Sequence, residues 1–265
     1  MEDIQEVLEA QSYLAPRQII EYMADQFTDR RLNSDDFYDI LTGVFEKEPT
    51  PMTSAELGEH RDALWEKGVL LETSPQGNGF LSRDFDLPPG RHLRFYLNAH
   101  DAPGSRQILE SIVEELRGHR FRIKTVGLAS DGFLRNDNTL VYVALGDAPG
   151  YFDYMRRLSA KHADCFDDEV PLMSRKLGKG IGYAASPVKG MIHIFDEFFN
   201  LANGSFNYAH CMVLQATFNR VIEKGIEEFD HITSLYQDAL LHTRFDPERP
   251  YLGLGMKDPL EVCSL

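Results

Sequence analysis

The chain has 265 residues and a formal net charge of −15, with 27 lysines and arginines against 42 aspartates and glutamates. This acidic balance argues against a nucleic-acid-binding protein, because binding to phosphate backbones needs a dominant basic face. The apolar share of 43% is ordinary for a globular protein, and no stretch has the run of apolar residues that a membrane-spanning helix needs.

The cysteines and the first residues of the chain bear on its location. Three widely spaced cysteines, at positions 165, 211 and 263, argue against a disulfide framework and against a zinc ribbon. The acidic segment Met1–Glu6 lacks the basic and apolar regions of a signal peptide. We therefore expect a cytoplasmic protein with reduced thiols and no membrane association.

The first 90 residues are predicted to form a mainly helical region with a small hairpin. Apolar spacing predicts helices over 18–27, 37–44 and 54–65, and strands over 69–72 and 80–85. Glu56 follows Thr53 by three residues, as in a capping box at a helix start. Leu87-Pro-Pro-Gly90 is the candidate linker between a domain of residues 1–90 and a domain of residues 91–265.

The pattern from Arg91 onward predicts strands and helices in alternation. Strands are expected at 93–97, 121–128, 139–145 and 180–185, and helices at 105–117 and 149–163. This β-α-β-β-α-β order is the split βαβ, ferredoxin-like arrangement. The fold class is therefore α+β, with a small mixed or antiparallel sheet of about four strands packed with helices. The C-terminal segment is expected to be helical, over 191–201, 206–228 and 232–241.

Basic residues are concentrated between positions 91 and 190, a segment that contains 15 basic and 12 acidic residues. A local cationic excess in an acidic chain indicates a specific anionic ligand, such as a small phosphorylated group. Guanidinium groups bind phosphate through paired hydrogen bonds. The candidates for anion binding are Arg94, Arg122, Arg135, Arg175 and Lys176. Ordinary solvation at the surface is the alternative for each of them.

Three further residues are candidates for proton transfer. Lys124 lies in an apolar strand on the same parity as Arg122, and partial burial beside cations would lower its pKa and make it a general base. The alternative is a solvated outer strand face. His100 and His210 are candidate proton donors. No histidine pair has metal-ligand spacing, and the segment Gly178–Gly182 lacks the ending of a phosphate-binding loop, which favours a tight turn.

Several segments, in order along the chain, resemble the HopA-type family, first known as type III effectors of plant-pathogenic bacteria. Homologous domains of that family occur beside kinase-like proteins in lanthipeptide and thioamide peptide biosynthesis. The matching segments are Arg94-Phe-Tyr-Leu-Asn98, Phe121-Arg-Ile-Lys124, Arg135-Asn-Asp-Asn-Thr-Leu-Val-Tyr142, Pro171 to Pro187, Ser205-Phe206 with His210-Cys211, and Arg249-Pro-Tyr-Leu252. The chain departs from the family pattern at Asn207, His210 and Ala185-Ser186, and residues 188–204 resemble an insertion.

The resemblance implies a phosphoserine/phosphothreonine lyase acting on a phosphorylated precursor peptide that a separate kinase-like protein supplies. By chemical type we assign Lys124 as base, His210 or His100 as acid, and Arg94, Arg135, Arg175 and Lys176 as phosphate contacts. No metal or organic cofactor is required. Two alternatives remain: an effector-like protein, translocated into a host cell, that binds a partner without catalysis, and a phosphopeptide-binding domain that needs no base.

Overall fold

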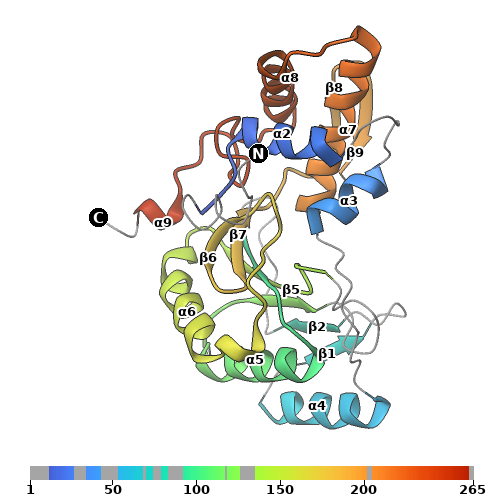
Figure 1. The fold of residues 1–265 in the computed structure, drawn as a ribbon. Coiled ribbons are helices and arrows are strands. Elements are labelled where there is room, and N and C mark those ends of the chain that lie inside the picture. Colours follow the sequence, from blue (N-terminus) through green and yellow to red (C-terminus); the bar gives the residue numbers. More distant parts are fainter. Residues whose placement is uncertain are drawn as a thin grey trace. The chain divides into compact units, whose positions relative to one another are not determined.

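The chain is an α+β protein, shown as a ribbon in Figure 1. A computed structural model describes residues 12–26, 34–42, 53–67, 70–73, 79–82, 92–116, 118–125, 135–201 and 205–262. The chain divides into two compact units. Unit 1 consists of residues 1–42, 172–175 and 184–258, and unit 2 consists of residues 43–171, 176–183 and 259–265.

A seven-stranded sheet has the strand order β1-β2-β4-β5-β3-β7-β6. Its strands are β1 (Leu70–Thr73), β2 (Gly79–Ser82), β3 (His92–Leu97), β4 (Arg122–Thr125), β5 (Thr139–Ala144), β6 (Arg175–Gly178) and β7 (Ile181–Ala185). The central order β4-β5-β3-β7 is that of a split βαβ unit, so this prediction from the sequence is confirmed. The hairpin predicted upstream is also confirmed, because β1 pairs antiparallel with β2, and β2 extends the sheet beyond β4.

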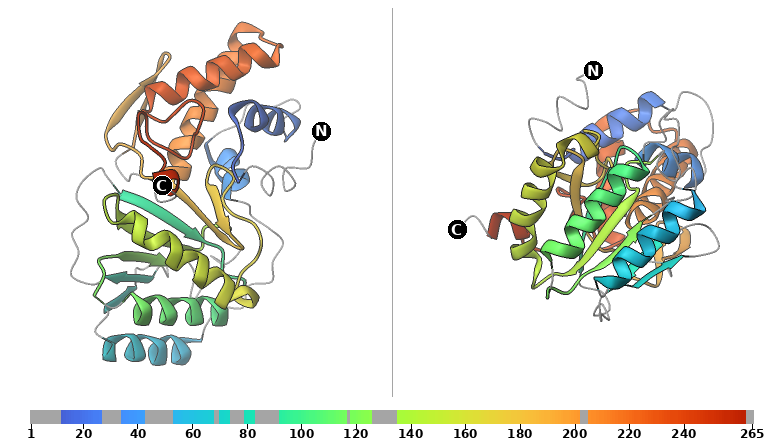
Figure 2. Two further views of the ribbon diagram at one scale, coloured as in Figure 1. Left: turned by 90° about the vertical axis from the view of Figure 1, so that its left-hand side faces the viewer. Right: turned by 90° about the horizontal axis from the view of Figure 1, so that it is seen from below.

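Three helices of unit 2 lie side by side over one face of the sheet, as Figure 2 shows in the view from below. They are α4 (Ser54–Glu66), α5 (Ala102–Glu115) and α6 (Ala148–Lys161). The predicted capping box starts α4: the Thr53 hydroxyl accepts from the Glu56 amide, and the Glu56 carboxylate accepts from the Thr53 amide. The described part of this unit also contains a short 3-10 turn (Ala163–Cys165) and the helix α9 (Pro259–Val262).

Side-chain alternation along the strands gives the sheet two different faces. Phe95 of β3 is fully buried, and its ring lies 5.3 Å from the ring of Phe152 on α6, centroid to centroid. The helices therefore cover the face to which Phe95 belongs. Arg94 and Tyr96, on either side of Phe95, belong to the opposite face.

The glycine-rich segment 178–182 forms the turn between β6 and β7, as the sequence predicts. Gly180 has a φ of 61°, in the left-handed region that favours glycine. A Cβ atom at Gly178 would lie only 2.8 Å from the Ser159 hydroxyl, which donates a 2.9 Å hydrogen bond to the Lys179 carbonyl. These glycines therefore allow close packing of the hairpin against α6.

Unit 1 is mainly helical. Its elements are α2 (Pro16–Gln26), α3 (Ser34–Thr42), β8 (Met191–Ile194), β9 (Glu197–Asn200), α7 (Phe206–Lys224) and α8 (Phe229–His242). Gly225, with a φ of 63°, ends α7. Among the described residues, no helix is both long and apolar enough to cross a membrane.

The helix predicted over 191–201 is wrong, because this segment forms the antiparallel hairpin β8–β9. Ile194 is buried, whereas Met191 and Phe198 are largely exposed, as expected for a two-stranded ribbon with one covered face. The connection is the two-residue turn at Phe195 and Asp196, in which Phe195 takes a φ of 53°. The predicted linker at 87–90 lies outside the described residues, and the domain boundary after residue 90 stays a prediction.

Candidate functional site

The sheet face that lies opposite α5 and α6 carries a set of basic and aromatic side chains within unit 2. The register pairs Arg94 of β3 and Arg122 of β4 with the same residue of β5, Tyr142. One row further along, Lys124 pairs with Leu140. We call this set the basic sheet face, and it consists of Arg94, Tyr96, Arg122, Lys124, Leu140 and Tyr142.

Lys124 is half-buried on β4, which is hydrogen-bonded to β2 on one side and to β5 on the other. Burial lowers the pKa of Lys124, the charges of Arg135 and Arg94 lower it further, and the charge of Asp137 opposes them. The amine therefore has a larger neutral fraction than a solvated lysine has, which is the form that accepts a proton. The structure thus brings together Lys124, Arg94 and Arg135 of the predicted site residues.

Arg94 is almost fully buried, with 6% of its surface exposed. Its guanidinium carbon lies 5.2 Å from the centroid of the Tyr142 ring, within the range of a cation–π interaction. Burial raises the pKa of the neighbouring Tyr96 well above its usual value, and the charge of Arg94 partly opposes this increase. Tyr96 is therefore a neutral hydroxyl at physiological pH.

Arg135 lies in a turn just before β5 and forms a two-point ion pair with Asp137. Its Nε donates to Oδ1 at 2.8 Å and its Nη2 donates to Oδ2 at 2.9 Å. The turn is fixed to the end of β3 by buried amides: Asn98 donates to Asn136 at 3.3 Å, and Asn138 donates to the Ala99 carbonyl at 2.8 Å. This network gives Arg135 a defined position beside Lys124.

Two other predicted residues belong to unit 2 but are not linked to the basic sheet face by any described contact. Lys176 lies on β6, two strands beyond β3 in the sheet order, and is partly exposed. His100 follows β3 and is largely exposed, and its Nδ1 lies 2.8 Å from Asp167 Oδ1. The His100 ring is therefore accessible to solvent.

Arg175 is held inside unit 1 by a buried carboxylate. Its Nη1 contacts Oδ2 of Asp258, whose side chain is fully buried, and lies 3.3 Å from the Tyr251 hydroxyl. The Tyr251 hydroxyl donates to the same carboxylate at 2.7 Å. Much of the Arg175 charge is thereby neutralised by its own unit.

His210 is completely buried on α7. Its ring stacks on Phe245 at a centroid distance of 4.3 Å and meets the edge of Phe206 at 4.5 Å. Burial lowers the pKa of His210 to about 3, although the Pro250 backbone partly opposes the shift. This histidine is neutral at pH 7, so it has no imidazolium proton to donate there.

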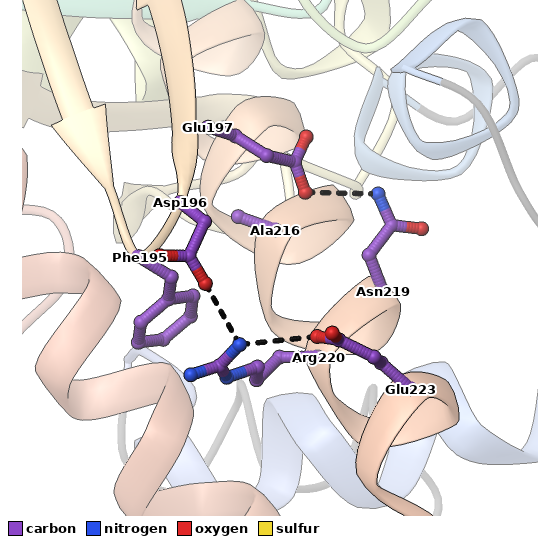
Figure 3. A pocket seen from close by; sticks show the side chains of 7 residues that line it. All are labelled: Phe195, Asp196, Glu197, Ala216, Asn219, Arg220 and Glu223. Carbon is purple, nitrogen blue, oxygen red and sulfur yellow. Dashed lines mark hydrogen bonds and ion pairs between the residues drawn. The ribbon is translucent and has the colours of Figure 1, made fainter.

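Unit 1 also contains a pocket of about 430 Å³ between the β8–β9 turn and α7, shown in Figure 3. Arg220 lies in it and donates to Asp196 at 2.9 Å and to Glu223 at 3.0 Å, and Asn219 donates to Glu197 at 3.2 Å. Three carboxylates around one guanidinium disfavour a phosphate ligand. No three histidine, cysteine, aspartate or glutamate side chains gather within the described ranges to hold a metal ion.

Sequence reasoning assigned no role to Asp137, Tyr142 or the three asparagines that fix the turn. All five lie in or beside the quoted segments, so their presence was visible in the sequence. The signal for Asp137 was a single acidic residue two positions after Arg135 in a basic region. What the sequence did not show was that these residues meet.

The fold and this face define an α+β protein with a split βαβ sheet that carries cations on the face away from its helices. The chain belongs to the HopA1 effector protein family, whose model matches residues 75–252. The structure resembles the effector protein from Pseudomonas syringae pv. tomato strain DC3000, with a TM-score of 0.64 and 15% identity, covering 90% of this chain and 96% of that one. It also resembles the effector protein from Pseudomonas syringae pv. syringae strain 61, with a TM-score of 0.62, 18% identity and the same coverages. No curated protein matches the chain.

Proposed function

We propose that this protein is a phosphoserine/phosphothreonine lyase that acts on a phosphorylated peptide. In the reaction, a base removes the Cα proton of the phosphorylated residue. The electron pair of that C–H bond forms a Cα=Cβ double bond, and the Cβ–O bond breaks with release of phosphate. The product is dehydroalanine from phosphoserine or dehydrobutyrine from phosphothreonine. The reaction needs no oxidant, metal or organic cofactor.

The observation that carries the proposal is the environment of Lys124. A half-buried lysine beside Arg94 and Arg135 has a lowered pKa, which increases the fraction of neutral amine that can accept the Cα proton. The same cations that disfavour the ammonium form would attract a phosphate dianion. A bound phosphate would stabilise the ammonium that forms when Lys124 takes the Cα proton, so the charge develops where it is compensated.

The remaining roles follow from charge and exposure. Arg94 and Arg135 are the phosphate contacts that accompany Lys124, with Arg175 and Lys176 as further candidates. Of the two candidate acids, His100 suits proton transfer to the leaving oxygen better than His210, because His100 is exposed and paired with Asp167, whereas His210 is buried and neutral. The substrate would be a precursor peptide phosphorylated by a separate kinase-like protein.

Replacement of Lys124 tests the proposal. Synthetic phosphoserine and phosphothreonine peptides are incubated with the protein, and released phosphate and the dehydrated peptide are measured by a colorimetric assay and by mass spectrometry. We expect Lys124→Ala to lower the rate by about 10²–10⁴-fold while phosphopeptide binding persists. The control is Lys161→Ala, which removes an exposed lysine paired with Glu115 on the helix-covered side of unit 2 and should keep the wild-type rate.

A second candidate is an effector-like protein that enters a host cell and binds a partner there without catalysis. It is favoured by the family, whose description is that of effector proteins, and by the likeness to two solved effectors. Phosphopeptide binding by the wild type with no phosphate release from any phosphopeptide would favour this candidate over the lyase.

A further inference from the structure

The turn that precedes β5 contains a carboxylate whose position is fixed from several sides. The Asp137 side chain is only 6% exposed, and its carboxylate accepts two hydrogen bonds from the Arg135 guanidinium. Its chain neighbours Asn136 and Asn138 are also buried; Asn98 donates to Asn136 at 3.3 Å, and Asn138 donates to Asn98 at 3.4 Å. An arginine–carboxylate fork in such a setting restricts the guanidinium to one orientation.

Asp137 also acts on Lys124. Among the described residues, the charges of Arg94 on β3 and of Arg135 and Asp137 in the turn act on Lys124, and Tyr96, Tyr142 and Arg122 belong to the same sheet face. The acidic member of this set is Asp137. It opposes the combined effect of Arg135 and Arg94 on the lysine.

We infer that Asp137 is a positioning residue of this site, which orients the Arg135 guanidinium through a two-point ion pair and sets the net charge that Lys124 experiences. The effect of Asp137 on catalysis, as distinct from its effect on Arg135 and Lys124, rests on the proposed lyase function. Asp137 would act through Arg135 and Lys124 without touching the reacting atoms. The charge of Asp137 thus opposes the lowering of the Lys124 pKa by the two arginines.

A purely structural role for Asp137 predicts a different result when each partner of the ion pair is removed. If the ion pair only stabilises the turn, removing either partner loosens the same loop, so both changes shift the pKa of Lys124 in the same direction. If Asp137 sets the local charge, removing the Asp137 carboxylate lowers the pKa of Lys124, whereas removing the Arg135 guanidinium raises it. The sign of the two effects therefore separates the two roles.

The experiment uses Asp137→Asn and Arg135→Gln in the full chain. Lysines are labelled by reductive methylation with ¹³C-formaldehyde, the Lys124 signal is identified with Lys124→Arg, and its titration midpoint is followed by NMR. We expect the midpoint to fall by about one pH unit in Asp137→Asn and to rise by a similar amount in Arg135→Gln. The double variant, which leaves neither charge unpaired, should return the midpoint close to the wild-type value.

The pH dependence of phosphate release is measured on the same proteins. In Asp137→Asn the limb of the pH profile assigned to the base should move to lower pH, and the maximal rate should fall about tenfold because Arg135 is no longer held at two points. Asp137→Glu, which restores the charge, should recover the position of the limb.

The outcomes keep this inference apart from the proposed function. Opposite midpoint shifts without any elimination by the wild type would support the charge-setting role and reject the lyase. Elimination by the wild type, with a Lys124 midpoint and a pH profile unchanged in Asp137→Asn, would reject the inference and leave the lyase standing. Shifts of equal sign in both single variants would also overturn it.

Discussion

The cations of the basic sheet face and Arg175 are placed in contrasting surroundings, each within its own unit. Arg175 lies against the fully buried carboxylate of Asp258. Arg94, on the sheet face, lies over the ring of Tyr142, and Lys124 experiences the charges of two arginines. The first cation contacts a fully buried carboxylate, whereas on the sheet face Arg94 lies against an aromatic ring and the charge of Asp137 opposes the effect of the two arginines on Lys124. Arginines of one sequence segment therefore differ in what they can offer a ligand.

The comparison is tested most strongly by removing the guanidinium of Arg175. Arg175→Met would leave the Asp258 carboxylate buried without its cation, and we expect a loss of about 3–5 kcal/mol in the free energy of unfolding. Urea denaturation at pH 7 measures it. The matched control is Arg220→Met, whose carboxylate partners are exposed, with an expected loss of about 1 kcal/mol or less. Equal losses in both variants would contradict the distinction.

The second prediction concerns the pH dependence that buried His210 imposes. Its pKa is lowered to about 3 in the folded protein, whereas the unfolded chain takes up this proton near pH 6.5. The unfolded state therefore binds more protons between these values, so stability is lost as the pH falls from 6.5 towards 3. We expect this group to contribute a loss of about 1.4 kcal/mol for each pH unit in that window.

Comparison of urea denaturation at pH 7 and pH 5 in the wild type and in His210→Phe isolates this contribution. The variant replaces the imidazole with a ring that does not titrate, in a pocket already lined by Phe206 and Phe245. The wild type should lose about 2 kcal/mol more than the variant between the two pH values. An identical pH dependence in both would show that His210 does not titrate as proposed.

The smallest effect is expected at the pocket of Figure 3. Asp196 pairs with Arg220, but 82% of its side chain is exposed. We expect Asp196→Asn to change the free energy of unfolding by about 0.5 kcal/mol or less, because exposed ion pairs are weak. Thermal or urea unfolding measures this, and a loss above about 1.5 kcal/mol would place this ion pair with that of Arg175.

Much of the fold was predictable because its signals are local. The capping box at Thr53 and the apolar spacing of α5 and α6 act within a few residues, so the sequence displays them directly. The order of the central strands then follows from the sequence of elements. The β8–β9 hairpin was missed because its apolar run suits either period, and its turn uses Phe195 in a backbone region where glycine or asparagine normally gives the signal.

The candidate site was predictable in its residue types and less so in its partnerships. Alternation placed Arg94 and Lys124 on exposed or half-exposed strand faces, but the register that aligns β3, β4 and β5 decides that they share one face. The partner that each cation meets depends on which side chains are buried together. Arg175 and Arg94 look alike in the sequence, and only the folded chain shows that Asp258 meets the first and Tyr142 the second.

The position of β4 inside the sheet has a consequence for dynamics. Because β2 and β5 pair with the two edges of β4, the Lys124 backbone is not part of an edge strand, and it can leave the sheet completely only when both ladders open. The amine that we assign as base therefore stands on a rigid support. Under the proposed function, a motion that admits a phosphopeptide would come from the surroundings of β4 and not from β4 itself.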